Sequence, residues 1–362
     1  MIRSVTAILV AGSMVFAPVA NACTGIQLSA KDGTQVAGRT LEFGAPIDWY
    51  VTTVPAGTEI SAELPAGSTG LTYKTKYGIT GMTAYQSTDF VDGLNEQGLS
   101  VGLFYFPGYA SYPDLSEENS AKALAPQQFA TWLLANFSSV DEVKAHYDDV
   151  VLVAATFEQM GEVIPMHVRV IDKSGNALVI EPTDKTLKVF DAPLGVITNS
   201  PTYDWHMTNL SNFINLSVVN VPPVKLDGVQ LEAAGQGAGM HGLPGDFTPP
   251  SRFVRAAVFS KSAMPVDTGA EVLDQTFHIL NNFDIPYGAV RGEDNGKPAP
   301  DYTQWTSVAD MTNGTWTVKT YDDQNLRVVD LKSALAAADG KVVHIDPKQW
   351  SQTYQNISSD FK

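Results

Sequence analysis

The chain has 362 residues and is acidic: 39 aspartates and glutamates outnumber 23 lysines and arginines, a formal net charge of −16 at pH 7. Its length allows a sizeable core, and 44% hydrophobic residues are typical of a globular protein. The acidic balance and the lack of a basic stripe argue against nucleic acid as a partner. Beyond residue 22, no apolar run approaches the length needed to span a membrane.

Residues 1–22 have the three parts of a secretory leader. Arg3 supplies a basic start, an apolar run extends from Val5 to Phe16, and Ala20-Asn21-Ala22 forms a small-x-small cleavage site. Cleavage after this site would make Cys23 the first residue of the mature protein. We therefore expect an exported protein that is periplasmic or secreted.

Cys23 is the only cysteine in the chain, so it has no partner for a disulfide. Cleavage would place its thiol and a free α-amine on one residue, at the start of a mature domain that covers residues 23–362. That residue would be a nucleophile with its own base. Two alternatives remain open. One is an inert buried thiol; the other is a lipid-modified cysteine, although such sites usually have an aliphatic residue where this chain has Ala20.

The segment after Cys23 predicts a β-hairpin, because apolar residues alternate on both sides of a turn at Asp32-Gly33. A two-residue loop would place Cys23 opposite Glu42, and a four-residue loop would place it opposite Thr40. Either register brings the amino terminus beside Arg39 and Glu42.

Further along the chain, hydrophobic periodicity predicts strands and helices. The predicted strands are Gly70–Tyr77, Ser100–Phe106, Met166–Ile171, Ala177–Glu181, Thr186–Phe190, Thr303–Asp310, Thr315–Tyr321 and Leu326–Leu331. The predicted helices are Pro126–Phe137, Ser139–Tyr147 with Ser138 or Ser139 as cap, Thr248–Ser260 with Thr248 as N-cap, and Thr268–Asn281. Strands, then helices, then strands, without regular βαβ alternation, indicate an α+β fold with antiparallel sheets.

Acyl transfer at Cys23 requires an activated thiol, a proton carrier and donors for an oxyanion. A nearby cation such as Arg39 favours the thiolate. The α-amine, with an ordinary pKa of roughly 7.7–8.0, can exchange a proton near neutral pH, and a carboxylate such as Glu42 is placed to orient it. Taken alone, an Arg-x-x-Glu pattern on a strand is more often a surface pair.

A pairing of Cys23 with a histidine is the rival use of the thiol. No histidine lies in a cluster with acidic residues at metal-ligand spacing, so the sequence does not support a zinc site. The six histidines are His146, His167, His206, His241, His278 and His344. The run Gly237–Gly242 formally matches G-x-G-x-x-G, but it neither follows a clear strand nor opens a helix, which argues against dinucleotide binding.

Four blocks of the sequence resemble the choloylglycine hydrolase/penicillin V acylase family. The blocks are Cys23-Thr24-Gly25 with Gly38–Phe43, then Asp92–Leu99, Gly195–His206, and Gly242–Pro249 with Ser251-Arg252-Phe253. The resemblance implies an N-terminal-nucleophile hydrolase with a four-layer αββα sandwich of two antiparallel sheets, usually tetrameric. It implies a small-molecule amide as substrate and no metal or organic cofactor.

The resemblance also implies a role for each matching residue. Cys23 would be the nucleophile and its own amine the base. Arg39 and Arg252 match two active-site arginines of the family. The side-chain amide of Asn199 and the backbone N–H of Tyr105 would donate to the oxyanion.

Two positions bear on the substrate. The family usually has aspartate where this chain has Glu42, which lengthens the reach of the carboxylate by one methylene. Tyr105 favours penicillin V acylases, whereas Phe106–Ala110 is closer to bile-salt enzymes. We therefore expect an exported, penicillin V acylase-like amidase, with conjugated bile salts or N-acyl homoserine lactones as alternative substrates. A different class also remains: a membrane-tethered binding lipoprotein without catalysis.

Overall fold

The computed structural model describes residues 22–65, 67, 68, 70–294 and 297–361. The predicted leader therefore lies outside the described residues, except for Ala22. Among the residues described, no helix is long and apolar enough to cross a membrane.

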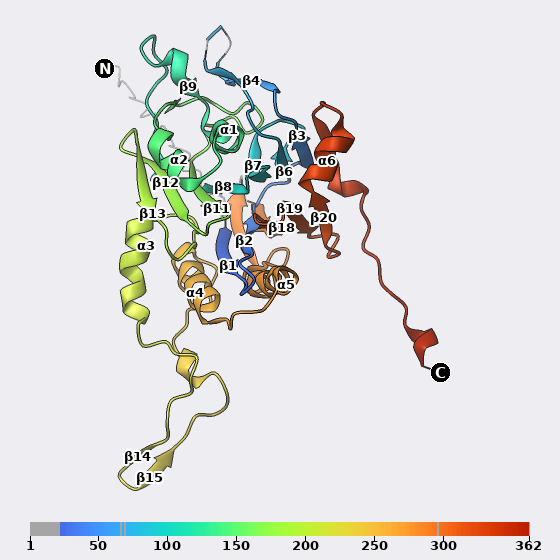
Figure 1. Ribbon diagram of the computed structural model, residues 1–362. Coiled ribbons are helices and arrows are strands. Elements are labelled where there is room, and N and C mark those ends of the chain that lie inside the picture. Colours follow the sequence, from blue (N-terminus) through green and yellow to red (C-terminus); the bar gives the residue numbers. More distant parts are fainter. Residues whose placement is uncertain (1–21, 66, 69, 295–296, 362) are drawn as a thin grey trace, which may run out of the picture.

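Two antiparallel sheets form the centre of the molecule (Figure 1). The eight-stranded sheet has the order β13 (Thr186–Asp191), β12 (Ala177–Thr183), β11 (Met166–Asp172), β8 (Leu99–Tyr105), β7 (Phe90–Asn95), β6 (Ile79–Ala84), β3 (Trp49–Val54) and β21 (Val343–Ile345). The five-stranded sheet has the order β1 (Cys23–Ser29), β2 (Gln35–Glu42), β18 (Thr303–Asp310), β19 (Thr315–Thr320) and β20 (Arg327–Asp330).

Helices cover the outer face of each sheet. The five-stranded sheet packs against α4 (Pro249–Ser262) and α5 (Gly269–Leu280), and the eight-stranded sheet packs against α1 (Phe129–Asn136) and α2 (Val140–His146). This arrangement confirms the predicted α+β class and the four-layer αββα sandwich. The other elements are α3 (Tyr203–Leu210), α6 (Leu331–Ala338) and four two-stranded ribbons: β4 (Glu59–Ser61) with β5 (Thr72–Lys74), β9 (Ala123–Leu124) with β10 (Val151–Leu152), β14 (Val224–Leu226) with β15 (Val229–Leu231), and β16 (Val290–Asp294) with β17 (Lys297–Asp301).

Buried polar groups fix the position of one sheet against the other. Arg169 of β11 donates from Nη1 to the carbonyl of Ile26 at 3.0 Å and from Nη2 to the carbonyl of Gly38 at 3.2 Å. Asp92 of β7 accepts from Ser307 Oγ at 2.8 Å. Because an unpaired polar group in this core would be costly, these bonds hold the sheets in one relative position.

The predicted hairpin is confirmed, but both predicted registers are wrong. Cys23 pairs with Leu41, and the loop between β1 and β2 has five residues. A backbone bond from Ala30 N to Thr34 O, at 2.9 Å, closes this loop, and Gly33 adopts the positive φ of 93° that the turn requires. The five-residue loop places Cys23 opposite Leu41, which lies between the two expected partners, Thr40 and Glu42.

Most of the other predicted elements are confirmed to within a few residues at each end. The exceptions are the strand predicted at Gly70–Tyr77, which is reduced to β5, and the start of the first helix, where Pro126–Gln128 forms a 3-10 turn. Ser139 caps α2 by accepting from Glu142 N at 3.2 Å, as predicted. Thr248 precedes α4 as predicted, but its side chain makes no capping hydrogen bond, and its hydroxyl donates to Asp246 Oδ1.

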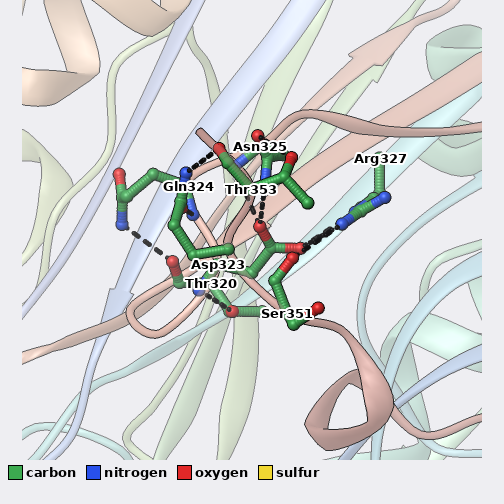
Figure 2. Close-up of polar contacts among 8 residues, drawn as sticks. Thr320, Asp323, Gln324, Asn325, Arg327, Ser351 and Thr353 are labelled. Atoms are coloured by element: carbon green, nitrogen blue, oxygen red, sulfur yellow. Dashed lines mark hydrogen bonds and ion pairs between the residues drawn. The ribbon is translucent and has the colours of Figure 1, made fainter. Parts of the chain in front are cut away.

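The carboxyl-terminal segment after β21 is pinned to the turn between β19 and β20 (Figure 2). Arg327 donates to Asp323 Oδ2 from Nε and Nη2, at 2.9 and 2.7 Å. Gln324 N donates to Gln352 Oε1 at 2.6 Å, and Thr353 Oγ1 contacts Asn325 Oδ1 at 3.3 Å. The bonds of Gln352 and Thr353 attach the segment to the turn, and the Arg327–Asp323 ion pair holds that turn against β20.

Candidate active site

Cys23 is the first residue of β1, at an edge of the five-stranded sheet, and the residue is only 4% exposed. The Ala22–Cys23 peptide is intact in this structure and lies within the site. Cys23 N donates to Asn199 Oδ1 at 2.8 Å, and Ala22 O accepts from Glu42 N at 2.8 Å. Cleavage of this peptide would therefore remove the acceptor of Glu42 N and convert the Cys23 nitrogen, next to the thiol, into a free amine.

Asn199 connects three parts of the site. Its Oδ1 accepts from Cys23 N and, at 2.7 Å, from Arg252 Nη2, and its Nδ2 donates to the carbonyl of Tyr105 at 2.7 Å. The two partners of Oδ1 can only donate and the partner of Nδ2 can only accept, so the network fixes the orientation of the amide. The predicted oxyanion donor thus lies beside Cys23, with one of its two hydrogens engaged.

Arg252 reaches the same point from the first turns of α4. Its Nη1 donates to the carbonyl of Cys23 and, at 3.0 Å, to Thr24 Oγ1, while its Nε donates to Phe247 O at 2.8 Å. Burial lowers the pKa of this guanidinium, and the charge of Glu42 acts in the opposite direction. Arg252 therefore orients Cys23 through its backbone and also places positive charge in the site.

Arg39 occupies the point where the ladder between β7 and β8 stops. Asp92 and Gly102 are the last paired residues at this end of the ladder, so Val91 and Leu103 are the next to face each other. Arg39 Nη1 donates to both of their carbonyls, at 3.0 and 2.6 Å. The guanidinium thus bridges the two strands where their backbone hydrogen bonds end. Its Nη2 is buried and has no hydrogen-bond partner among the described residues.

Glu42, at the end of β2, is fully buried and does not hold the Cys23 nitrogen in this structure. Its Oε1 accepts from Thr303 Oγ1 at 2.9 Å, and its Oε2 has no hydrogen-bond partner in the described part of the chain. Burial raises the pKa of Glu42 to about 8, against the opposing charge of Arg252. The carboxyl group that was expected to orient the amine therefore favours its protonated, uncharged form near pH 7 while the Ala22–Cys23 peptide is intact.

The Cys23 thiol experiences opposing effects. Burial raises its pKa, Arg39 and Arg252 lower it, and Glu42 raises it further. The net direction is upward, so the proximity of a cation, which the sequence indicated, does not by itself produce a thiolate. A proton acceptor beside the sulfur is required.

His206 lies in the third block, and no specific role was predicted for it. Its Nε2 contacts the carbonyl of Asn199 at 2.9 Å and must carry the proton, because a carbonyl only accepts. The ring stacks on Phe253 at 4.6 Å, and burial lowers its pKa to about 4. His206 is therefore neutral near pH 7 and holds the backbone of Asn199. Within the described ranges, no group of three or more His, Cys, Asp or Glu side chains is arranged to hold a metal ion.

A pocket of about 700 Å³, part of which is open solvent, lies beside Cys23. Its walls are mostly apolar and come from both sheets and from the loop between β10 and β11. The residues that line it are Cys23, Leu41, Glu42, Phe43, Ile47, Trp49, Ala84, Tyr85, Ser87, Asp89, Val91, Leu103, Tyr105, Gln127, Phe157, Met160, Ile164 and Met166. The side chain of Tyr105 packs edge-on against Phe43, with ring centroids 6.1 Å apart.

Residues 23–343 match the family of linear amide C–N hydrolases, choloylglycine hydrolase family. The chain belongs to the choloylglycine hydrolase family. It is accordingly a hydrolase of carbon–nitrogen bonds in linear amides, as the resemblance implied.

Individual relatives agree with the family match. A bile salt hydrolase/transferase of Clostridium perfringens is 35% identical over 312 residues, which are 85% of this chain and 92% of that protein. A crystal structure of a conjugated bile acid hydrolase variant from the same organism has a TM-score of 0.82 at 31% identity, covering 93% of this chain and 100% of that one. The penicillin V acylase of Agrobacterium tumefaciens shares the fold, with a TM-score of 0.72 at 22% identity over 90% of this chain and 91% of that one.

Proposed function

We propose that the protein is an exported amidase in which Cys23, freed by cleavage after Ala22, is the N-terminal nucleophile. The observation that carries this proposal is the convergence of Asn199, Arg252 and an apolar pocket on the only cysteine of the chain. The pocket would hold the acyl part of the substrate, with the amine part toward solvent.

The reaction begins with attack of the Cys23 sulfur on the amide carbonyl. The α-amine takes the thiol proton as the S–C bond forms, and the carbonyl oxygen becomes an oxyanion. The same amine then gives its proton to the leaving nitrogen as the C–N bond breaks, which leaves a thioester. Water, deprotonated by the amine, attacks the thioester and releases the carboxylic acid and the thiol.

Asn199 is suited to two parts of this reaction. Its Oδ1 accepts from the Cys23 nitrogen, which orients the amine, and the second hydrogen of its Nδ2 is available to the oxyanion. The backbone N–H of Tyr105 would be the second donor. Glu42 would accept from the amine only after cleavage, when the nitrogen carries additional hydrogens.

The acyl group remains to be assigned among related amides. Tyr105 in the pocket wall favours penicillin V acylase-like specificity. Conjugated bile salts are the second candidate, and the 35% identical bile salt hydrolase/transferase of Clostridium perfringens favours them. A product assay of the mature protein with penicillin V, glycine- and taurine-conjugated bile salts and N-acyl homoserine lactones would rank these substrates.

Mass spectrometry of the mature amino terminus tests the mechanism and its rival. We expect a free Cys23 at the terminus. A lipid on Cys23 would block the amine and favour the membrane-tethered binding lipoprotein. A free Cys23 without turnover of any amide would instead favour a binding module.

A further inference from the structure

A buried histidine–carboxylate pair lies behind the loop that carries Asn199. His167 is the second residue of β11 and Glu181 lies in β12, and their side chains are 2% and 0% exposed. His167 Nδ1 lies 3.2 Å from Glu181 Oε1, and His167 Nε2 lies 3.0 Å from the carbonyl oxygen of Thr198. Neither side chain lines the pocket beside the thiol, so the proposed reaction does not use this pair directly.

The pair connects the two ends of that loop. Glu181 Oε1 also accepts from the backbone N–H of Tyr203, the first residue of α3, at 2.9 Å. A chain of hydrogen bonds therefore runs from the carbonyl of Thr198 through His167 and Glu181 to Tyr203 N. Residues 199–202, with Asn199 as the first of them, lie between two fixed points.

The acceptors in this chain of bonds determine where the protons are. The carbonyl of Thr198 can only accept, so Nε2 of His167 carries a hydrogen. One more proton must lie between Nδ1 and Oε1 of Glu181, either on the imidazole or on the carboxyl group. In both arrangements the pair has no net charge, which lowers the cost of burying it.

Aromatic packing fixes the plane of the imidazole. The His167 ring stacks on Phe106, with ring centroids 4.3 Å apart and planes within 4°, and it lies edge-on to Phe104 at 6.2 Å. These two residues flank Tyr105, whose carbonyl accepts from Asn199 Nδ2 at 2.7 Å. His167 therefore contacts the chain neighbours of both residues to which the oxyanion donors belong.

We propose that His167 and Glu181 are positioning residues that hold Asn199 in place for the oxyanion. His167 fixes the carbonyl that precedes Asn199, and Glu181 fixes both the imidazole and the far end of the loop. This inference rests on the proposed function, because it takes Asn199 as an oxyanion donor. A misplacement of about 1 Å can cost on the order of 10² in rate, so the effect belongs in kcat rather than in KM.

Two substitutions of His167 separate its two hydrogen bonds. In His167→Gln the amide nitrogen can take the place of Nε2 and donate to Thr198, but the bond to Glu181 is lost. In His167→Asn the amide can take the place of Nδ1 and donate to Glu181, but it does not reach Thr198. Both variants lose the stacking on Phe106, so each is the matched control of the other.

The two variants should rank in opposite orders for activity and for stability. We expect kcat to fall about 10²-fold in His167→Asn and less than about 10-fold in His167→Gln, with KM nearly unchanged in both. Urea unfolding should show His167→Asn to be the more stable variant, because Glu181 keeps a side-chain donor there. A merely structural role would make activity follow stability, and that result would overturn the inference.

NMR separates this inference from the proposed function, because it requires no turnover. In the mature wild-type protein, the proton between His167 and Glu181 should give a strongly downfield signal, which is lost in Glu181→Gln. The side-chain amide signals of Asn199 should move in His167→Asn and stay near their wild-type positions in His167→Gln. These results would support the positioning role even if no amide were cleaved. A missing downfield signal in wild type, or equal movement of the Asn199 signals in both variants, would contradict it even in an active enzyme.

Discussion

The two ends of the pocket differ in how their polar groups are paired. Beside Cys23, the side chain of Asn199 has partners on β1, on β8 and on α4, contributed by Cys23, Tyr105 and Arg252. At the other end, Asp89 lines the cavity beside Glu63, and burial raises the pKa of both carboxyl groups. The polar groups beside Cys23 are therefore fixed by bonds within the protein, whereas the end at Asp89 holds two buried carboxyl groups that resist carrying charge. Catalysis needs preorganised groups, and the bonds beside Cys23 supply them at this reactive end.

The largest effect is expected at the centre of the reactive end. Cys23→Ala should lower kcat by on the order of 10³ or more, because the nucleophile is lost while the surrounding bonds use only backbone atoms of this residue. Activity on the preferred amide and the thermal unfolding midpoint should be measured together. Activity that survives in the folded variant would refute the nucleophile assignment.

The next effect should come from Arg39, which joins the end of the β7–β8 ladder to the site. Arg39→Met leaves the carbonyls of Val91 and Leu103 unpaired, so we expect a loss of about 3 kcal/mol in the free energy of unfolding. Activity should fall as well, since a charge that lowers the pKa of Cys23 is removed.

Arg39→Lys is the matched control, because it keeps the positive charge but not the planar fork that reaches both carbonyls. It should retain more activity than Arg39→Met and recover part of the stability, as measured by urea unfolding. If Arg39→Met were as stable and active as the wild type, the bridging role would be wrong.

The lowered pKa of His206 should make the free energy of unfolding depend on pH. Its native pKa of about 4 lies below the ordinary value of 6.5, so the unfolded chain binds more protons than the native chain between these pH values. The free energy of unfolding should therefore decrease as the pH falls from 6.5 to 4, by about 3 kcal/mol from this residue. In His206→Gln, whose amide can still donate to Asn199, this contribution should disappear from urea titrations. An unchanged wild-type slope in that variant would contradict the prediction.

The smallest effect is expected at the carboxyl-terminal segment, beyond the family match. Lys348 forms an ion pair with Asp48, in the loop next to the pocket residues Ile47 and Trp49, and both charged side chains are more than half exposed. Lys348→Ala should therefore cost less than about 1 kcal/mol in stability. KM should rise at most a few-fold, with kcat unchanged. A large drop in kcat would show that this segment controls the reactive end.

Local sequence patterns predicted much of the fold. The turn at Asp32-Gly33 correctly predicted the hairpin, and Ser139 correctly predicted the start of α2. The strand predicted at Thr303–Asp310 agrees with β18 at both ends. The single cysteine after a leader-like segment also pointed to the candidate nucleophile. These predictions are reliable because turn, cap and strand preferences depend on only a few neighbouring residues.

Other features could not be predicted from the sequence, because they depend on contacts between residues that are distant in the chain. The partner of the Cys23 nitrogen lies 176 positions away, and Thr303, which bonds Glu42, lies 261 positions away. Asp89 and Gln127 carry no local motif, and only the pocket brings them together with Cys23. The one-residue change in register likewise depended on the five-residue loop.

The sequence by itself determined the αββα family, the hydrolase class and the candidate nucleophile. Short blocks with fixed residue types around Cys23, Asn199 and Arg252 were sufficient for that. Only the tertiary structure decided how Arg39 bridges two strands, that burial outweighs the cations at the thiol, and that Asp89 lies in the pocket wall beside Glu63. Burial and long-range pairing are properties of the packed sheets, and they set the pKa values of the buried groups around Cys23.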